Sequence, residues 1–191
     1  WEEEASGRTS KRMHTRVRLK ELYPQVDFAN NNPDQLWFID LKLGNICNLK
    51  CRICGSWSSS KWVPEEMEYV KEWGGDPKKH IAYTWLKQGN WPRNENSTRF
   101  WEDLKTILPH VKYFEFTGGE PFMSHRPLAL LKHVQRTGNI AELEFSCNTN
   151  GSVEPSNELI DLWKQCKSVN IYFIIDAVGK EFEYIRNPLR W

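Results

Sequence analysis

Short apolar segments alternate with amphipathic segments along most of this chain. The short segments are rich in β-branched and aromatic residues, which is typical of strands. The longer segments carry apolar residues at helical spacing and are punctuated by proline and glycine. We therefore expect strands at residues 36–43, 112–116, 142–146 and 169–175, and helices at 64–73, 98–108, 127–136 and 156–166, the last one capped by Ser156.

Strands that alternate with helices indicate an α/β fold with parallel pairing, right-handed crossovers and both faces of the sheet covered. About four such units fit part of a β/α barrel or an open doubly wound sheet. The chain begins at Trp1 and ends at Trp191 within this repeating pattern. We expect a fragment, with residues 1–35 as a basic N-terminal extension and residues 36–191 as a core that is incomplete at its C-terminus.

Composition narrows the class of protein without giving its function. A chain of 191 residues with 39% hydrophobic residues can fill one core. The net charge of +1 argues against a nucleic-acid-binding surface. The basic stretch from Arg8 to Lys20 is expected to be a solvated arm or helix face. No apolar stretch reaches the length of a signal or membrane segment, so we expect a cytoplasmic protein without membrane contact.

Tryptophan is unusually frequent, with ten residues in the chain. Six of them fall between the cysteine-rich segment and the second predicted strand. We expect them to pack a local core, and a peptide-binding surface is the alternative. The six are Trp57, Trp62, Trp73, Trp85, Trp91 and Trp101.

Three cysteines, Cys47, Cys51 and Cys54, directly follow the first predicted strand. A [4Fe-4S] cluster usually takes four thiolates. Neither Cys147 nor Cys166 has a Cys-x-x-Cys partner, so three thiolates would leave one iron open, which implies chemistry rather than scaffolding. A structural zinc site would require a second Cys or His pair, which the spacing does not show. Zinc and a chance spacing remain the alternatives.

Polar or glycine-rich elements follow all four predicted strands. In parallel β/α folds this edge of the sheet binds ligands, so we expect the four loops to converge. Glu120 supplies a carboxylate suited to an ammonium group, and Asp176 one suited to a sugar hydroxyl. Each loop alone also fits an ordinary turn or helix cap. The four elements are residues 44–45, 117–121, 148–151 and 176–177.

These motifs, in this order, resemble the radical S-adenosylmethionine (radical SAM) superfamily across residues 36–191. They are Cys47-x-x-x-Cys51-x-x-Cys54, Gly118-Gly119-Glu120-Pro121, Thr149-Asn150-Gly151 and Asp176. The resemblance implies a partial (β/α)6 TIM-like barrel with about four β/α units. The cysteine segment and the Phe-Glu-Tyr-Ile-Arg sequence at residues 182–186 also resemble members that carry an auxiliary twitch or SPASM segment.

Carried over to this chain, the resemblance implies that the three cysteines hold a [4Fe-4S] cluster whose fourth iron chelates the amino and carboxylate groups of SAM. Gly118, Gly119 and Glu120 would bind the SAM amino group, and Pro121 would hold the turn. Thr149 and Asn150 would contact the ribose or methionine part, and Asp176 would lie at the matching end of the fourth strand.

Two positions depart from the family pattern. Ile53 stands where an aromatic residue commonly approaches the adenine, and Ile174 stands where a serine is frequent. The implied activity is reductive cleavage of SAM to a 5'-deoxyadenosyl radical that abstracts a hydrogen atom. The substrate is unknown, with a peptide or protein as the leading expectation, and the electron donor would be a flavodoxin or ferredoxin. A non-catalytic iron-sulfur or zinc-binding module, or an inactive fragment, is the alternative.

Overall fold

The computed structural model describes residues 2–24, 36–80, 83 and 95–191. It divides the chain into two compact units, Trp1–Gln35 and Leu36–Trp191. The first unit contains α1 (Glu2–Ala5) and α2 (Lys11–Leu22). Ser10 caps α2 by accepting a hydrogen bond from the Met13 N–H at 3.1 Å. The basic side chains of this unit are exposed, as a solvated helix face requires.

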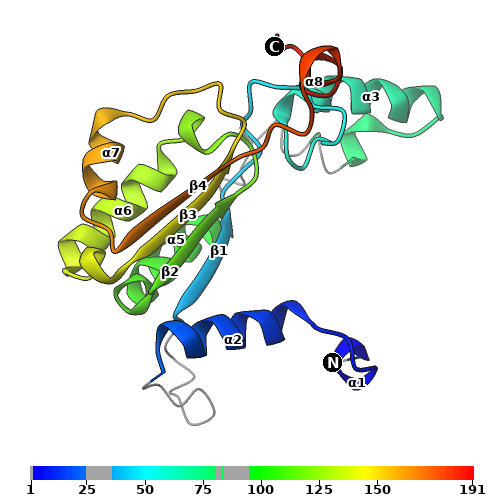
Figure 1. The fold of residues 1–191 in the computed structure, drawn as a ribbon. Coiled ribbons are helices and arrows are strands. Elements are labelled where there is room, and N and C mark those ends of the chain that lie inside the picture. Colours follow the sequence, from blue (N-terminus) through cyan, green and yellow to red (C-terminus); the bar gives the residue numbers. More distant parts are fainter. Residues whose placement is uncertain (1, 25–35, 81–82, 84–94) are drawn as a thin grey trace. The chain divides into compact units, whose positions relative to one another are not determined.

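The second unit is built on four parallel strands in sequential order (Figure 1). An open doubly wound sheet would reverse its strand order at a switch point, whereas a barrel adds each new strand on the same side. The fold is therefore α/β and matches part of a TIM-like barrel. The strands are β1 (Phe38–Lys42), β2 (Tyr113–Thr117), β3 (Glu144–Thr149) and β4 (Ser168–Phe173).

Helices connect the strands, and most of their positions agree with the pattern in the sequence. The Ser156 hydroxyl accepts a hydrogen bond from the Leu159 N–H at 3.2 Å, which confirms the expected cap. The α-helices are α3 (Val63–Glu72), α5 (Glu95–Ile107), α6 (Arg126–Thr137), α7 (Asn157–Trp163) and α8 (Gly179–Ile185). The 3-10 turns are η1 (Ser60–Trp62), η2 (Pro77–Lys79), η3 (Leu108–His110), η4 (Pro121–Met123) and η5 (Ile140–Glu142).

One face of the sheet packs against α5, α6 and α7 in a single apolar layer. Alternate strand residues such as Leu41, Phe114 and Phe145 point into it, and both phenylalanines have no exposed surface. The Phe116 ring meets Phe114 edge-on, with 4.5 Å between centroids. Fully burying a side chain of this size contributes roughly 1.5–3 kcal/mol, so this layer holds the fold together.

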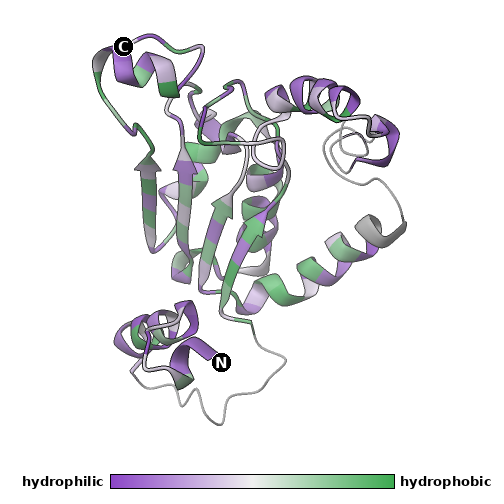
Figure 2. Cartoon of the chain, turned by 90° about the vertical axis from the view of Figure 1, so that its right-hand side faces the viewer, coloured by the Kyte–Doolittle hydropathy of each residue, from purple (hydrophilic) through white to green (hydrophobic). Residues whose placement is uncertain are grey.

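The opposite face of the sheet is mostly polar. Its exception is the start of β1 and β2, where the Phe38 ring stacks on Tyr113 with 4.6 Å between centroids. The remaining strand positions place Asp40, Lys42, Glu115 and Asn170 there, and no cluster of buried apolar side chains lies on it among the described residues. Figure 2 shows the polar bands along the strands. Among the described residues, helices pack on one face only, so the expectation that both sheet faces are covered is wrong for this part of the chain. A barrel segment covers only its outer face, which explains the difference.

Several predicted boundaries were also wrong by a few residues. β3 runs to Thr149, so Cys147, Asn148 and Thr149 lie in the strand rather than in the loop. β4 ends at Phe173, before Ile174 and Ile175, because the chain turns at Asp176, whose φ of 67° no strand accommodates. The helix expected to end at residue 108 ends at Ile107 and tightens into η3, which contains Pro109.

The tryptophans divide between the two expectations. Trp62 and Trp101 are half-buried, which fits a packing role. Trp57 and Trp73 are 55% and 87% exposed, so the packing prediction is wrong for these two. Trp85 and Trp91 lie outside the described residues.

Candidate functional site

The cysteine loop, residues 44–54, leaves the carboxyl end of β1 and is held by its own polar groups. The Asn45 amide donates to the Ser56 carbonyl at 2.6 Å, and the Trp62 indole N–H donates to the Cys51 carbonyl at 2.9 Å. Cys47 and Cys51 are buried, and Cys54 is half-buried; all three are free thiols. Leu49 packs between the sulfur-bearing side chains in a small apolar cluster.

The Gly-Gly-Glu-Pro loop, residues 118–121, lies directly on the cysteine loop. The Glu120 N–H donates to the Ile46 carbonyl at 2.7 Å, and the Gly119 N–H donates to the Ser58 carbonyl at 3.1 Å. A Cβ added at Gly119 would stand 2.4 Å from the Ile46 oxygen, and the φ of this glycine is 66°. Contact between the two loops therefore already requires a glycine here, independently of any ligand.

The Glu120 carboxylate joins the loops after β2 and β3. It is 1% exposed, and it accepts hydrogen bonds from the Thr149 hydroxyl at 2.8 Å and the Asn150 N–H at 2.9 Å. The Phe122 N–H adds a third at 3.3 Å. A buried carboxylate is stable only with such donors. Both oxygens are thus used inside the chain, so the ammonium contact expected of Glu120 stays a prediction.

Asn150 carries this network on to the first cysteine. Its amide lies 3.8 Å from the Cys47 sulfur and donates to the Asn48 side-chain oxygen at 3.1 Å. The Leu49 N–H points at the same sulfur from 3.4 Å. Burial raises the pKa of the Cys47 thiol, and these donors oppose that effect. The structure therefore brings the second and third predicted motifs to the first.

Arg186 connects the end of the fourth strand to the cysteine loop. No role for this residue was predicted from the sequence. Its guanidinium donates to the Cys51 sulfur at 3.5 Å and forms an ion pair with Asp176, and the residue is only 5% exposed. Backbone bonds from Arg52 to the Ile185 carbonyl at 2.9 Å, and from Lys50 to the Asn187 carbonyl at 2.8 Å, hold the segment in place.

The sequence offered one signal for this contact, the Phe-Glu-Tyr-Ile-Arg sequence that ends in Arg186. Nothing local indicates that this arginine is buried, because its partners lie 10 and 135 residues away along the chain. Asp176, predicted to meet a sugar hydroxyl, instead faces Arg186 from a left-handed backbone conformation. A non-glycine residue in that conformation is uncommon and marks a constrained turn.

The guanidinium and a neighbouring thiol change the acidity of Cys51. A hydrogen bond with Cys54, assisted by Arg186, lowers the pKa of Cys51, while the same hydrogen bond and burial raise the pKa of Cys54. Thiolates are the form that metals bind. One member of the pair is therefore prepared to ligate.

Cys147 and Cys166 lie elsewhere, in or against the apolar layer under the helices. Burial raises the pKa of Cys147 to about 12 and that of Cys166 to about 11. Thiols that ionise so weakly are poor ligands. The expectation that neither one supplies a fourth ligand stays a prediction.

Two positions where the family pattern is broken are both on the surface. Ile53 is 62% exposed on the cysteine loop, and Ile174 is 36% exposed after β4. Neither side chain belongs to a buried apolar cluster of the described residues. How Ile53 contacts an adenine, in place of the common aromatic residue, stays a prediction.

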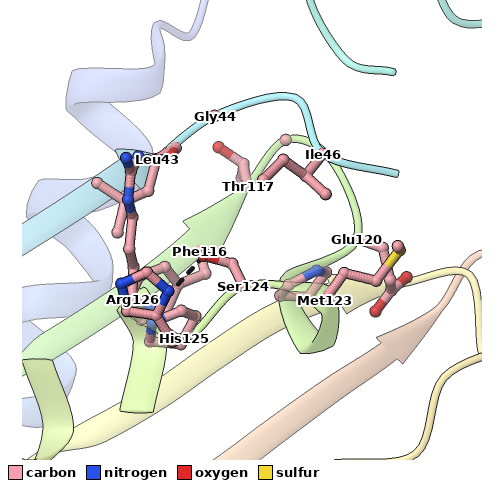
Figure 3. Close-up of a pocket in the computed structure, with 13 residues that line it drawn as sticks. Leu43, Gly44, Ile46, Phe116, Thr117, Glu120, Met123, Ser124, His125 and Arg126 are labelled. Carbon is pink, nitrogen blue, oxygen red and sulfur yellow. Dashed lines mark hydrogen bonds between the residues drawn. The ribbon is translucent and has the colours of Figure 1, made fainter. Parts of the chain in front are cut away.

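A cavity of about 120 Å³ lies beside this edge, between the ends of β1 and β2 and the start of α6. Figure 3 shows Arg126 and Leu43 at one end and Glu120 with Met123 at the other. None of the three loop cysteines lines it. It is also smaller than the ~300 Å³ at which small-molecule pockets begin. The cavity can therefore hold only part of a ligand that extends along the edge.

The sequence model of one family matches most of this chain. It is described as the radical SAM superfamily, and the match covers residues 41–190. The chain belongs to the radical SAM superfamily. Comparisons with curated proteins and with solved structures found no match. Membership indicates SAM-dependent radical chemistry in general, while the twitch or SPASM subtype stays a prediction.

Members of the radical SAM superfamily typically bind a [4Fe-4S] cluster and SAM. Among the described residues, no three side chains of ligating type already stand close enough to hold a metal ion. The donor set nevertheless fits a cluster. Cys51 and Cys54 share a hydrogen bond, Cys47 is close enough for its charge to act on both, and donors from Leu49 and Arg186 point at the sulfurs.

Among the described residues, no helix combines the length and the apolar character needed to cross a bilayer.

Proposed function

We propose that this chain is the core of a radical SAM enzyme, with Cys47, Cys51 and Cys54 holding a [4Fe-4S] cluster. One observation carries the proposal: the loops after β2, β3 and β4 all reach the cysteine loop through Glu120, Asn150 and the Asp176–Arg186 pair. When bound, the cluster and SAM supply one-electron cleavage of SAM and a carbon radical that can abstract a hydrogen atom.

The chain's own residues would position these groups and exclude water. Arg186 and the Leu49 N–H would donate to the ligating sulfurs, which favours a cluster that accepts an electron. Gly118, Gly119 and Pro121 would present backbone to the methionine end of SAM, on a loop fixed by the buried Glu120. Thr149 and Asn150 would line the ribose or methionine part, and Asp176 would stay at the fourth strand end.

The wider setting is part of the same proposal. We propose a peptide or protein substrate, a flavodoxin or ferredoxin as electron donor, and a cytoplasmic location. Five free thiols support a reducing compartment. β4 is an edge strand of the four-stranded sheet, and its last residue, Phe173, is 62% exposed. A partner could therefore pair with the sheet along β4.

The test is anaerobic reconstitution with iron and sulfide. We expect about four irons per chain, a broad visible absorbance, SAM binding by calorimetry and 5'-deoxyadenosine formation with dithionite. Cys51→Ala should lose the absorbance, whereas Cys166→Ala, a thiol away from the loop, should keep it. A colourless protein with one zinc per chain would contradict the proposal, and a coloured protein that neither binds nor cleaves SAM would reduce it to a non-catalytic cluster module.

A further inference from the structure

The polar face of the sheet contains one straight row of four side chains, which we call the middle row. Strand pairing sets Asp40 beside Glu115, Glu115 beside Ser146, and Ser146 beside Asn170. Because side chains alternate along a strand, residues that pair in register share one face. The four side chains therefore lie next to each other across all four strands, on the face away from the apolar layer.

Ser146 shows that this row is incomplete without a ligand. The residue is 1% exposed, and its hydroxyl has no hydrogen-bond partner among the described residues. An unpaired buried polar group costs about 1–3 kcal/mol. Parallel strands usually carry apolar residues on both faces, so a valine or alanine would have been the more stable choice at this position.

The other side chains of the middle row also have unused hydrogen-bonding groups. Within the described residues, the side chains of Glu115 and Asn170 form no hydrogen bond or ion pair. Asp40 accepts one bond, from the Thr117 hydroxyl at 3.0 Å. A carboxylate pair offers roughly eight lone-pair positions, so most of the acceptor capacity of the row is unused.

The cations nearest to the row already have other partners. Lys167 pairs with Glu144 at 2.9 Å, one pleat toward the start of the strands. Lys42 donates to the Ser58 hydroxyl at 3.1 Å, on the side of the cysteine loop. Among the described residues, neither the Asp40 nor the Glu115 carboxylate therefore forms an ion pair.

The middle row lies a short distance from the carboxyl ends of the strands, where the cysteine loop begins. It precedes the last residues of β1 and β2, Lys42 and Thr117, by two positions. At ~3.3 Å per residue, this is about 7 Å below the edge from which the cysteine loop departs. A molecule anchored in the row would extend toward that edge.

We propose that the middle row binds a cationic group of the substrate, a guanidinium or a primary ammonium. Asp40 and Glu115 would accept its N–H bonds with opposite charge, and Ser146 and Asn170 would complete the acceptor set. The cation would be carried by a peptide side chain or by a free amine. This inference names the substrate class of the proposed radical SAM site, and in that respect it rests on the proposed function.

Binding of matched ligands tests the substrate class. The probes are capped tripeptides with a central arginine or its neutral isostere citrulline, and agmatine as a free amine, titrated calorimetrically into the full chain with and without reconstituted iron. We expect the arginine peptide or agmatine to bind at least tenfold tighter than the citrulline peptide. Tighter binding of the arginine peptide would indicate a peptide side chain as the source of the cation, and tighter binding of agmatine would indicate a free amine.

Three variants locate the binding. Glu115→Gln keeps the shape of the side chain and should abolish the preference for charge, whereas Glu102→Gln, an exposed acid on α5, should retain it. Ser146→Ala should weaken binding severalfold without lowering the unfolding free energy, because the hydroxyl has no partner to lose. Equal affinity for arginine and citrulline, or an unchanged preference in Glu115→Gln, would overturn the proposal.

The design separates this inference from the proposed function. The preference should persist in the iron-free chain, because no hydrogen bond or ion pair joins the middle row to the cysteine loop among the described residues. A chain that shows the preference but never cleaves SAM would contradict the proposed function alone. A chain that cleaves SAM but shows no preference would contradict the cationic substrate alone.

Discussion

Cys51 and Cys147 are the same residue type in opposite surroundings. Cys147 faces the apolar layer of β3 with no exposed surface, and burial raises its pKa to about 12. Cys51 is also buried, at 3% exposure, yet Arg186 and Cys54 lower its pKa. Burial alone therefore does not decide reactivity; the groups that meet the sulfur do.

The contrast extends to the two regions that contain these cysteines. The apolar layer between the sheet and α5, α6 and α7 supplies packing without polar groups, and the carboxyl edge supplies polar contacts without a comparable core. One face of the strands thus contributes most of the stability, and the carboxyl ends of the same strands carry the groups suited to chemistry. A substitution in one region should leave the properties of the other intact, which the following experiments test.

The largest expected effect is loss of stability from the apolar layer. Phe114→Ala should lower the unfolding free energy by about 3–5 kcal/mol, because it removes a fully buried ring and leaves a cavity. Denaturant titration followed by circular dichroism measures this change. The matched control is Phe173→Ala, whose ring is 62% exposed on β4 and should cost less than about 1 kcal/mol. Similar losses in both variants would remove the distinction between core and edge.

A glycine substitution should damage the carboxyl edge while leaving the core packed. Gly119→Ala places a Cβ 2.4 Å from the Ile46 carbonyl oxygen at a φ of 66°. Strain and overpacking should together cost about 2–4 kcal/mol and separate the two loops, so reconstituted iron should be lost.

Gly138→Ala provides the control for that experiment. Gly138 also has a positive φ, of 86°, but a Cβ there would meet nothing within 4 Å. It should cost only about 1–2 kcal/mol for the left-handed conformation and keep full iron content. Iron loss in both variants would indicate a general effect of destabilisation rather than contact between the loops.

Thiol labelling of the iron-free chain should rank the two cysteines directly. At pH 7, iodoacetamide should modify Cys51 at least about a hundredfold faster than Cys147, because far more of Cys51 is thiolate. Labelling of Cys51 should decline as the pH falls through its lowered pKa, and Cys147 should react only as the pH approaches about 12. Peptide mass spectrometry over time measures both rates, and equal rates would show that access alone governs reactivity.

The sequence predicted the regions better than the contacts between them. The hydrophobic pattern was sufficient for four strands, their parallel pairing and the Ser156 cap, because these depend on local residues. It did not predict that one face is mostly polar, although Asp40 and Lys42 alternate with the buried Ile39 and Leu41 in β1, because this alternation spans only five residues.

The candidate site shows the same limit. Motif order was enough to expect the four strand-end loops near each other. It could not reveal that the Glu120 oxygens are used by Thr149 and Asn150, or that Arg186 reaches Cys51 across 135 residues. Such contacts depend on how distant loops fold over each other, which no local pattern encodes.

The smallest expected effect concerns Arg186, and it tests whether the edge tunes its sulfurs. Arg186→Gln removes a positive charge 3.5 Å from the Cys51 sulfur. In the iron-free chain, labelling of Cys51 at pH 7 should slow severalfold, because the pKa of Cys51 rises toward its ordinary value. In the reconstituted chain, the midpoint potential should become more negative, because the added electron loses a neighbouring cation. Arg190→Gln, whose side chain is 84% exposed and paired with Glu183, should change neither reading. If Arg186→Gln also changes neither, the buried arginine serves only to hold Asp176 and the C-terminal segment, and the low pKa of Cys51 comes from Cys54 alone.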